Sequence, residues 1–299
     1  MKKVIECVPN FSEGKDQKNI QKILDEINSV EGITIWDCLS DSNHNRTVIT
    51  FVGNPLAVKT AAINSAIIAS ELIDMSKHKG EHPRIGAIDV IPFVPLVGSD
   101  IEECILIAQE VAEELSNRLN IPTYLYGDAT TRYELKNLGY VQNIQYEGMF
   151  DKIKEEGYEP DFGPGEMNRK TGGSIIGARS ILVAFNVNLG TNDIKIARSI
   201  AKTIRESGGG LKNVKAMGVE LIDQNIVQVS MDMVNYKETP LYQSYELIKI
   251  EAARHGVPIV GSELIGLVPT DALVESAMYY FKLHDFSEKQ LIENRLNNY

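Results

Sequence analysis

The sequence from Thr47 to Ser70, TVITFVGNPLAVKTAAINSAIIAS, joins a predicted strand directly to a predicted helix. Residues 47–52 are mostly β-branched or aromatic, which favours a strand. Asn54-Pro55 is a helix-start signal, because asparagine caps a helix N-terminus and proline suits its first turn. The alanine- and isoleucine-rich segment that follows predicts a helix that runs to about Asp74.

The elements around this stretch give the first half of the chain a β-α-β-β-α-β order. A first helix is predicted because Ile20, Ile23, Leu24 and Ile27 follow the i, i+3, i+4, i+7 spacing. The other predicted strands cover residues 3–8, 33–37 and 87–94. A polar turn rich in serine and asparagine joins the two middle strands.

The second half of the chain repeats this order. Strands are predicted at 181–187, 214–221 and 226–233, and a last one begins at 257–260. Helices are predicted within 196–204 and 241–252, the second opened by Thr239-Pro240 as cap and first-turn proline. The repeated split-βαβ order predicts an α+β fold of two ferredoxin-like subdomains, residues 1–178 and 179–299.

The first half carries further elements before the two halves meet. A helix is predicted at 101–119 and a strand at 123–126. Residues 157–177 are rich in glycine and proline and have little hydrophobic periodicity. Irregular segments of this length are usually functional or disordered, and ligands favour domain junctions. A plain linker and a ligand loop both fit this segment.

Composition limits the functions that the chain can have. The net charge of -11 over 299 residues argues against nucleic-acid binding, since phosphate contacts need a basic face. The sequence has no signal-peptide pattern and no apolar run long enough for a membrane span, so we expect a cytoplasmic protein. Cys7, Cys38 and Cys104 lack paired spacing, which indicates reduced thiols.

The segment Lys77–Val90, KHKGEHPRIGAIDV, gathers two of the five histidines with two lysines, an arginine and a glutamate. Gly80 tolerates unusual backbone angles and Pro83 prevents a helix from continuing through His82, so we expect a shaped loop. Histidine can take and give a proton near neutral pH. The segment therefore predicts proton-transfer chemistry on an anionic substrate.

Two other interpretations of this segment stay open. A histidine before proline is often a turn residue that bonds a backbone carbonyl. The letters HKGEH at 78–82 also match the inverted zinc-peptidase motif, which needs a helix to aim both histidines at one metal. Because Gly80 and Pro83 disfavour that helix, we expect no metal site.

Three other polar segments have a structural explanation. Residues 37–47 are dense in hydrogen-bonding groups at a hairpin tip, and residues 10–14 follow the first strand, so a turn and a helix cap are favoured. Residues 207–210, SGGG, lack the Lys-Ser/Thr ending of a phosphate loop, so we expect a flexible turn.

Several long motifs of the chain resemble those of the glutamate formimidoyltransferase family. The motifs are residues 4–14 (VIECVPNFSEG), 45–47 (NRT), 77–84 (KHKGEHPR), 160–164 (PDFGP), 177–179 (GAR), 184–188 (AFNVN) and 261–269 (GSELIGLVP). The resemblance covers essentially the full chain. Animal members carry a fused cyclodeaminase domain, so the resemblance implies a stand-alone transferase here.

The resemblance implies an activity and its partners. Family members transfer a formimidoyl group from N-formimidoyl-L-glutamate to N5 of tetrahydrofolate and release glutamate, in histidine breakdown. They have two α/β subdomains with a folate tunnel between them and are usually homodimers. We therefore expect tetrahydrofolate as co-substrate, formimidoylglutamate as donor, and no metal.

The resemblance also implies roles for individual residues. His82 matches the family's catalytic histidine, and Asp41, or else Asp37, is the expected carboxylate partner of its imidazole, since position 39 is Leu39. The family's folate loop matches Gly163, Pro164, Gly165, Glu166, Met167, Asn168, Arg169, Lys170, Thr171 and Gly172. The expected substrate-binding residues are Asn10, Arg46, Lys79, Arg84 and Arg179.

In the expected mechanism, N5 of the folate attacks the amidine carbon, and His82 moves a proton to the departing nitrogen. One alternative is formyl transfer between 5-formyltetrahydrofolate and glutamate, because =NH and =O each present one small polar atom to a site. A non-catalytic folate-binding protein is a more distant alternative, and the composition of the His82 loop argues against it.

Overall fold

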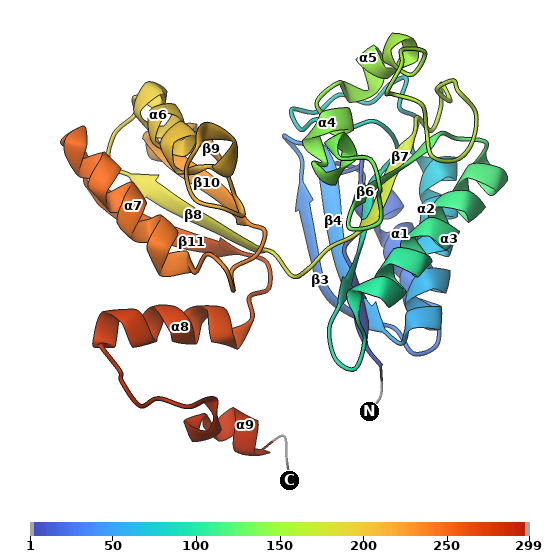
Figure 1. Cartoon of the computed structure of the whole chain (residues 1–299). Helices are drawn as coiled ribbons and strands as arrows, with labels where there is room; N and C mark the ends of the chain where they lie inside the picture. Colours follow the sequence, from blue (N-terminus) through green and yellow to red (C-terminus); the bar gives the residue numbers. More distant parts are fainter. Residues whose placement is uncertain (1–2, 297–299) are drawn as a thin grey trace. The chain divides into compact units, whose positions relative to one another are not determined.

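The computed structural model describes residues 3–296, and the chain divides into two compact units, residues 1–180 and 181–299 (Figure 1). Each unit combines one β-sheet with helices and has its own hydrophobic core. The fold is therefore mixed α+β, as the sequence predicts. Among the described residues, no helix is both long and apolar enough to cross a membrane.

The sheet of the first unit has seven strands. They are β1 (Ile5–Cys7), β2 (Asn10–Phe11), β3 (Thr34–Asp41), β4 (Arg46–Gly53), β5 (Ile88–Pro95), β6 (Thr123–Gly127) and β7 (Ser174–Ala178). Both β1 and β2 lie between β4 and β5 and pair with both, so they are two parts of one interrupted strand. Pro9 stands at the interruption, where its missing N–H removes a ladder bond.

The remaining strands extend this sheet at both edges. Strand β3 pairs with β4 in an antiparallel hairpin, while β7 pairs with β5 and β6 in parallel. Three long helices pack together and against the sheet: α1 (Gln17–Asn28), α2 (Pro55–Leu72) and α3 (Ile101–Leu119). Asp16, Asn54 and Asp100 cap them, because each side chain accepts backbone N–H groups of the first turn.

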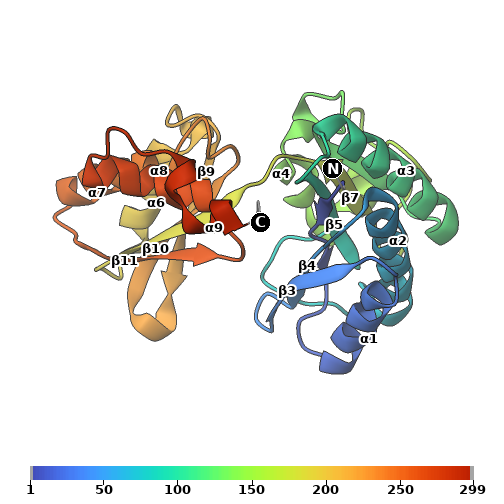
Figure 2. The same ribbon diagram turned by 90° about the horizontal axis from the view of Figure 1, so that it is seen from below.

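The second unit has a four-stranded antiparallel sheet in the order β11-β8-β10-β9. Its strands are β8 (Val183–Leu189), β9 (Val214–Leu221), β10 (Ile226–Met233) and β11 (Ile259–Ile265). Helices α6 (Ile194–Ile204) and α7 (Leu241–Arg254) pack on this sheet, and α8 (Thr270–Phe281) packs on α7 (Figure 2). Helix α9 (Ile292–Leu296) follows. The predicted order of elements in this half is confirmed.

Three parts of the structure differ from the sequence prediction. Strand β7 begins inside the segment that was predicted as irregular. It was missed because its short apolar run directly follows two glycines and is buried on both faces, so it shows no alternation. Short helices α4 (Gly139–Gln142) and α5 (Gln145–Lys152) were not predicted. Pro240 is the residue that caps α7 rather than the first residue inside it. Single 3-10 turns occur at Glu134–Lys136, Glu206–Gly208, Ile222–Gln224 and Glu288–Gln290.

Candidate functional site

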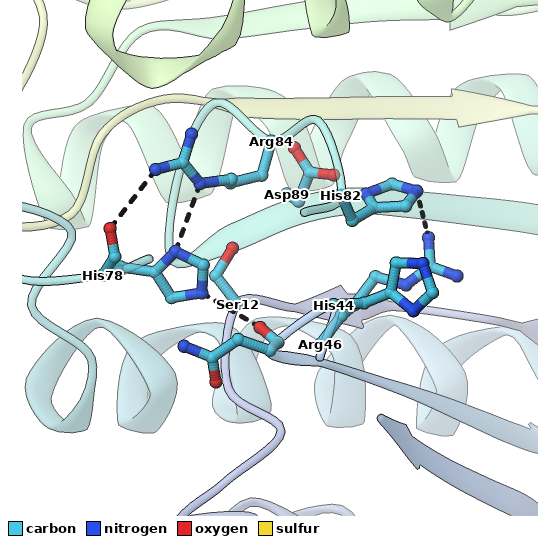
Figure 3. A pocket seen from close by; sticks show the side chains of 8 residues that line it. Ser12, His44, Arg46, His78, His82, Arg84 and Asp89 are labelled. Carbon is cyan, nitrogen blue, oxygen red and sulfur yellow. Dashed lines mark hydrogen bonds between the residues drawn. The ribbon is translucent and has the colours of Figure 1, made fainter. Parts of the chain in front are cut away.

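A small pocket of the first unit gathers the chemically active side chains of three segments (Figure 3). The segments are the loop after β2, the β3–β4 turn with the start of β4, and the loop between α2 and β5 with the start of β5. The residues that line the pocket are Ser12, His44, Asn45, Arg46, His78, His82, Arg84 and Asp89. The last segment is a loop and not a helix, as predicted.

Asn45 links these three segments through its side-chain amide and its backbone carbonyl. Its side-chain oxygen accepts the backbone N–H of Gly14 at 3.0 Å, and its amide nitrogen donates to the carbonyl of Lys79 at 3.0 Å. Its own carbonyl accepts a hydrogen bond from Nε2 of His78 at 2.9 Å. Asn45 has a positive φ of 49°, which asparagine tolerates better than most residues. The β3–β4 turn therefore fixes both neighbouring loops.

Two glycines allow the segments to approach this closely. A Cβ on Gly14 would lie 2.2 Å from the carbonyl oxygen of Asp41, and one on Gly80 would lie 2.2 Å from that of His44. Both neighbours are backbone atoms, so a side chain could be accommodated only if a loop moved. Gly80 was predicted to shape the loop, and its close contact with the β3–β4 turn explains why glycine is needed there.

His82 lies largely buried beside a cation. Arg46 donates from Nη1 to Nε2 of His82 at 2.5 Å, and Nδ1 of His82 is buried without a hydrogen-bond partner among the described residues. The pKa of His82 is lowered to about 4, mainly by burial and secondly by the charge of Arg46. The imidazole is therefore neutral at pH 7 and can accept a proton.

The second histidine of the loop is fixed on both ring nitrogens. Nε2 of His78 donates to the carbonyl of Asn45, and Nδ1 accepts from Nε of Arg84 at 3.1 Å. Arg84 is buried, and its two terminal nitrogens bond both carboxylate oxygens of Glu147 at 2.7 and 2.9 Å. Burial lowers the pKa of His78, and the Arg84 charge adds to that effect. His78 is therefore a neutral structural link.

Arg84, a predicted substrate-binding residue, already has a carboxylate partner within the protein, and its role in substrate binding stays a prediction. Arg84 was expected to bind a substrate carboxylate, but both of its terminal nitrogens already bond the carboxylate of Glu147, which comes from α5. A bidentate pair is the strongest contact that a guanidinium makes with a carboxylate. Arg84 therefore holds the loop to α5 and orients His78.

Asp41 contacts a different histidine from the one expected. Its Oδ2 lies 2.9 Å from Nδ1 of His44, and its Oδ1 accepts the backbone N–H groups of Asn43 and His44, both at 2.8 Å. These hydrogen bonds lower the pKa of Asp41. The expected Asp41–His82 bond is therefore not formed: Asp41 bonds His44 and its turn, and Nε2 of His82 bonds Arg46. The two histidine rings lie 6.3 Å apart, edge to face.

Five of the residues that line the pocket were not among the predicted site residues: Ser12, His44, Asn45, His78 and Asp89. Asp89, at the start of β5, is fully buried and accepts the N–H of Ile85 at 2.8 Å and the side-chain amide of Gln142 at 2.6 Å. Burial raises the pKa of Asp89 to about 6. Ser12 is buried and donates to the carbonyl of Gly86 at 2.7 Å. A charged residue inside an otherwise apolar strand was the available signal for Asp89.

The other predicted substrate-binding residues lie outside this pocket. The side-chain amide of Asn10 donates to the carbonyl of Val8 at 2.9 Å, which stabilises the interruption between β1 and β2. Lys79 is exposed on the His82 loop. Arg179 follows β7 and donates to the carbonyl of Ser180 at 3.1 Å. Their assignment to substrate binding stays a prediction.

The predicted folate loop, residues 163–172, packs against the His82 loop. Ala87 donates to the carbonyl of Thr171 at 2.7 Å, and Gly173 donates to that of Ile85 at 3.1 Å. Gly163 and Gly172 both have positive φ values, and Gly172 approaches the backbone of Ile85 too closely for a Cβ. A cavity of about 180 Å³ lies along the loop, and its walls are Asn120, Pro164, Glu166, Met167, Asn168 and Arg169.

The structure offers a specific test of the zinc motif. His78 uses both ring nitrogens for hydrogen bonds within the protein, Glu81 is exposed, and the segment is a loop. Within residues 3–296, no group of three or more histidine, cysteine, aspartate or glutamate side chains is arranged to hold a metal ion.

Comparison with known proteins gives matches over the full chain. Residues 4–179 match the model of the formiminotransferase domain, N-terminal subdomain, and residues 184–298 match that of the formiminotransferase domain. A glutamate formimidoyltransferase of Streptococcus pyogenes serotype M1 is 49% identical over 99% of both chains. One of Thermoplasma acidophilum is 46% identical over 98% of this chain and 97% of its own. The mouse formimidoyltransferase-cyclodeaminase is 41% identical over 99% of this chain and 57% of its own length.

Proposed function

The chain belongs to the formiminotransferase family, and we propose that it transfers the formimidoyl group of N-formimidoyl-L-glutamate to N5 of tetrahydrofolate. The observation that carries this proposal is the His82 pocket, in which a neutral imidazole stands beside an arginine. Full-length relatives with the name glutamate formimidoyltransferase support the same activity. The products are 5-formimidoyltetrahydrofolate and L-glutamate.

The reaction is an exchange of nitrogens at an amidine carbon. The bond from N5 to the formimidoyl carbon forms, and the bond from that carbon to the glutamate nitrogen breaks. N5 gives up one proton and the glutamate nitrogen gains one, so atoms and charge balance without a redox step. His82 is neutral at pH 7, so it can take the proton of N5 as general base once Arg46 has turned from its Nε2 to a substrate carboxylate.

Positive side chains near the pocket suit the carboxylates of both substrates. Arg46 lines the pocket, and its guanidinium can bind a carboxylate with two parallel hydrogen bonds. Lys79 and Arg179, with Asn10, are proposed for further substrate contacts. Residues 163–172 are proposed as the folate loop, since they border a cavity and are bonded to the His82 loop.

Several broader properties belong to the same proposal. The order β5-β1-β4-β3 in the first unit and β11-β8-β10-β9 in the second supports a ferredoxin-like class for both, with a boundary near residue 178. A cytoplasmic location, a homodimeric assembly, and the family's folate tunnel stay predictions. Formyl transfer to glutamate is a second outcome that the assay below separates.

The test is steady-state turnover of the purified chain with two substrate pairs. Tetrahydrofolate plus formimidoylglutamate should release glutamate, and His82→Ala should lower that kcat by about 10² to 10⁴, the usual contribution of a general base. If product forms only from 5-formyltetrahydrofolate plus glutamate, the activity is formyl transfer and not formimidoyl transfer. Absence of turnover with both pairs, together with folate binding, would favour a binding protein.

A further inference from the structure

The proposed reaction needs one proton taken from N5 and one given to the departing glutamate nitrogen. Nε2 of His82 already accepts a hydrogen bond from Arg46, so it can take the proton of N5 only after that bond has opened. A second titratable group in the pocket would let the glutamate nitrogen be protonated without a further change of partner at His82.

His44 has the geometry of such a group. It lines the same pocket, and its ring centre lies 6.3 Å from that of His82, with the two planes at 73° (Figure 3). Nδ1 of His44 donates to Oδ2 of Asp41 at 2.9 Å, while two backbone N–H groups fix Oδ1 of that carboxylate at 2.8 Å. The carboxylate therefore fixes one proton on Nδ1 and leaves Nε2 as the nitrogen at which the ring can take up and give a second proton.

We propose that His44, oriented by Asp41, is a second proton carrier of this site and protonates the departing glutamate nitrogen. The inference rests on the proposed function. In one turnover Arg46 turns from Nε2 of His82 to a substrate carboxylate, and that nitrogen gains the proton of N5. The His44 imidazolium gives the proton on its Nε2 to the glutamate nitrogen as the C–N bond breaks. The side chain of His44 is 47% exposed, so it recovers its proton from water, and His82 returns its own when the products leave.

The His44 ring has a carboxylate at Nδ1, while the pocket that it lines also contains cationic groups. Asp41, from its own turn, places a carboxylate on Nδ1. Arg46 from β4, His82 from the neighbouring loop, and more distantly Arg84 and Asp89, share the pocket with it. Because Asp41 orients the His44 ring and does not itself line the pocket, loss of Asp41 should weaken proton donation more than substrate binding.

The test compares two histidines in the same assay. His44→Asn keeps a hydrogen-bonding side chain of similar size but carries no titrating proton, and should lower kcat about 100-fold with KM for both substrates within about threefold. His284→Asn, an exposed histidine of the second unit, is the matched control and should leave kcat unchanged. In His44→Ala, added imidazole should restore part of kcat, which a merely structural role would not allow.

A positioning role for Asp41 has its own measurement. Asp41→Asn should give an intermediate kcat, and nitrogen-15 NMR of the His44 ring should show that the Nδ1–H tautomer is no longer the dominant one. If wild-type protein turns over and His44→Asn keeps kcat within twofold between pH 6 and 9, the inference is wrong while the proposed function stands. If wild-type protein does not turn over, the proposed function fails, and the inference fails with it.

Discussion

Arg46 donates a hydrogen bond to Nε2 of His82, so the central imidazole of the pocket is paired with a cation and not with a carboxylate. The sequence favoured a His82–Asp41 pair, and that carboxylate instead bonds His44. The Arg46 guanidinium is also the group of the pocket best suited to a substrate carboxylate. A carboxylate that binds Arg46 would reduce the charge beside His82 and favour its protonation.

Replacing Arg46 should separate these two effects. In Arg46→Gln, KM for formimidoylglutamate should rise by about 10- to 100-fold, since a charge-assisted bond worth about 1.5–3 kcal/mol is lost. The pKa of His82 should rise toward its usual value, because one of the two causes of its depression is removed. The ring-proton titration of His82 by NMR measures this directly.

The control for that variant is Arg254→Gln. Arg254 is an exposed partner of Glu251 in the second unit, so neither KM nor the titration of His82 should change. A His82 pKa that stays near 4 in Arg46→Gln would show that burial alone sets it.

Stability should respond to pH through His82 and Asp89 with opposite signs. The pKa of His82 falls from 6.5 to about 4 on folding, so the unfolded chain binds more protons in this range and stability is lost as pH falls. The pKa of Asp89 rises from 3.8 to about 6, so stability from that group is lost as pH rises through 6. Each total effect is at most on the order of 3 kcal/mol.

Urea unfolding at pH 4 to 7 can separate the two contributions. Relative to wild type, His82→Gln should become more stable as pH falls from 6.5 toward 4, and Asp89→Asn should become more stable as pH rises from 4 toward 6. Parallel curves for either variant and wild type would mean that the corresponding group has the same pKa in both states.

Glu147→Gln should destabilise the protein through the buried end of its ion pair. Arg84 is buried, so the loss of the opposite charge leaves a guanidinium with weaker compensation, at a cost of about 1–3 kcal/mol. Glu155→Gln is the matched control, because the exposed Glu155 pairs with a lysine, Lys152, that is only half-buried, and its loss should cost less than about 0.5 kcal/mol. Equal free energies of unfolding for both variants would contradict the assigned role of Arg84.

Gly80→Ala should disturb the pocket far more than Gly165→Ala. The new methyl group at Gly80 would lie 2.2 Å from the carbonyl oxygen of His44, whereas Gly165 has no atom within 4 Å. We expect Gly80→Ala to lower kcat at least 10-fold and stability by about 1–3 kcal/mol, since backbone must move. Gly165→Ala should change stability by less than about 0.5 kcal/mol. Thermal unfolding and kcat of both variants provide the comparison.

The repeating elements were predictable because they depend on local signals. The alternation in residues 226–233 and the asparagine cap before Pro55 each indicate an element without help from distant residues. Strand β7 was missed because its five residues follow two glycines, and only its parallel partners β5 and β6 make it a strand. Local propensity cannot indicate such pairing.

The pocket was predictable only in part, for the same reason. The composition of residues 77–90 indicates proton transfer and marks His82. The partner of each side chain depends on segments more than thirty residues away, as in the bond between Arg46 and His82. Asp89 was missed because its strand context suggested only burial, and the hydrogen bond from Gln142 comes from a helix that was not predicted.

The side chain of Asn45 has a consequence for the order of folding. It closes contacts with Gly14, 31 residues earlier, and with Lys79, 34 residues later. Contacts of such sequence separation carry a large loop-closure entropy and tend to form late. The chain can therefore build its helices and the β3–β4 hairpin before the pocket exists, and competence for chemistry would arise only in the last steps of folding.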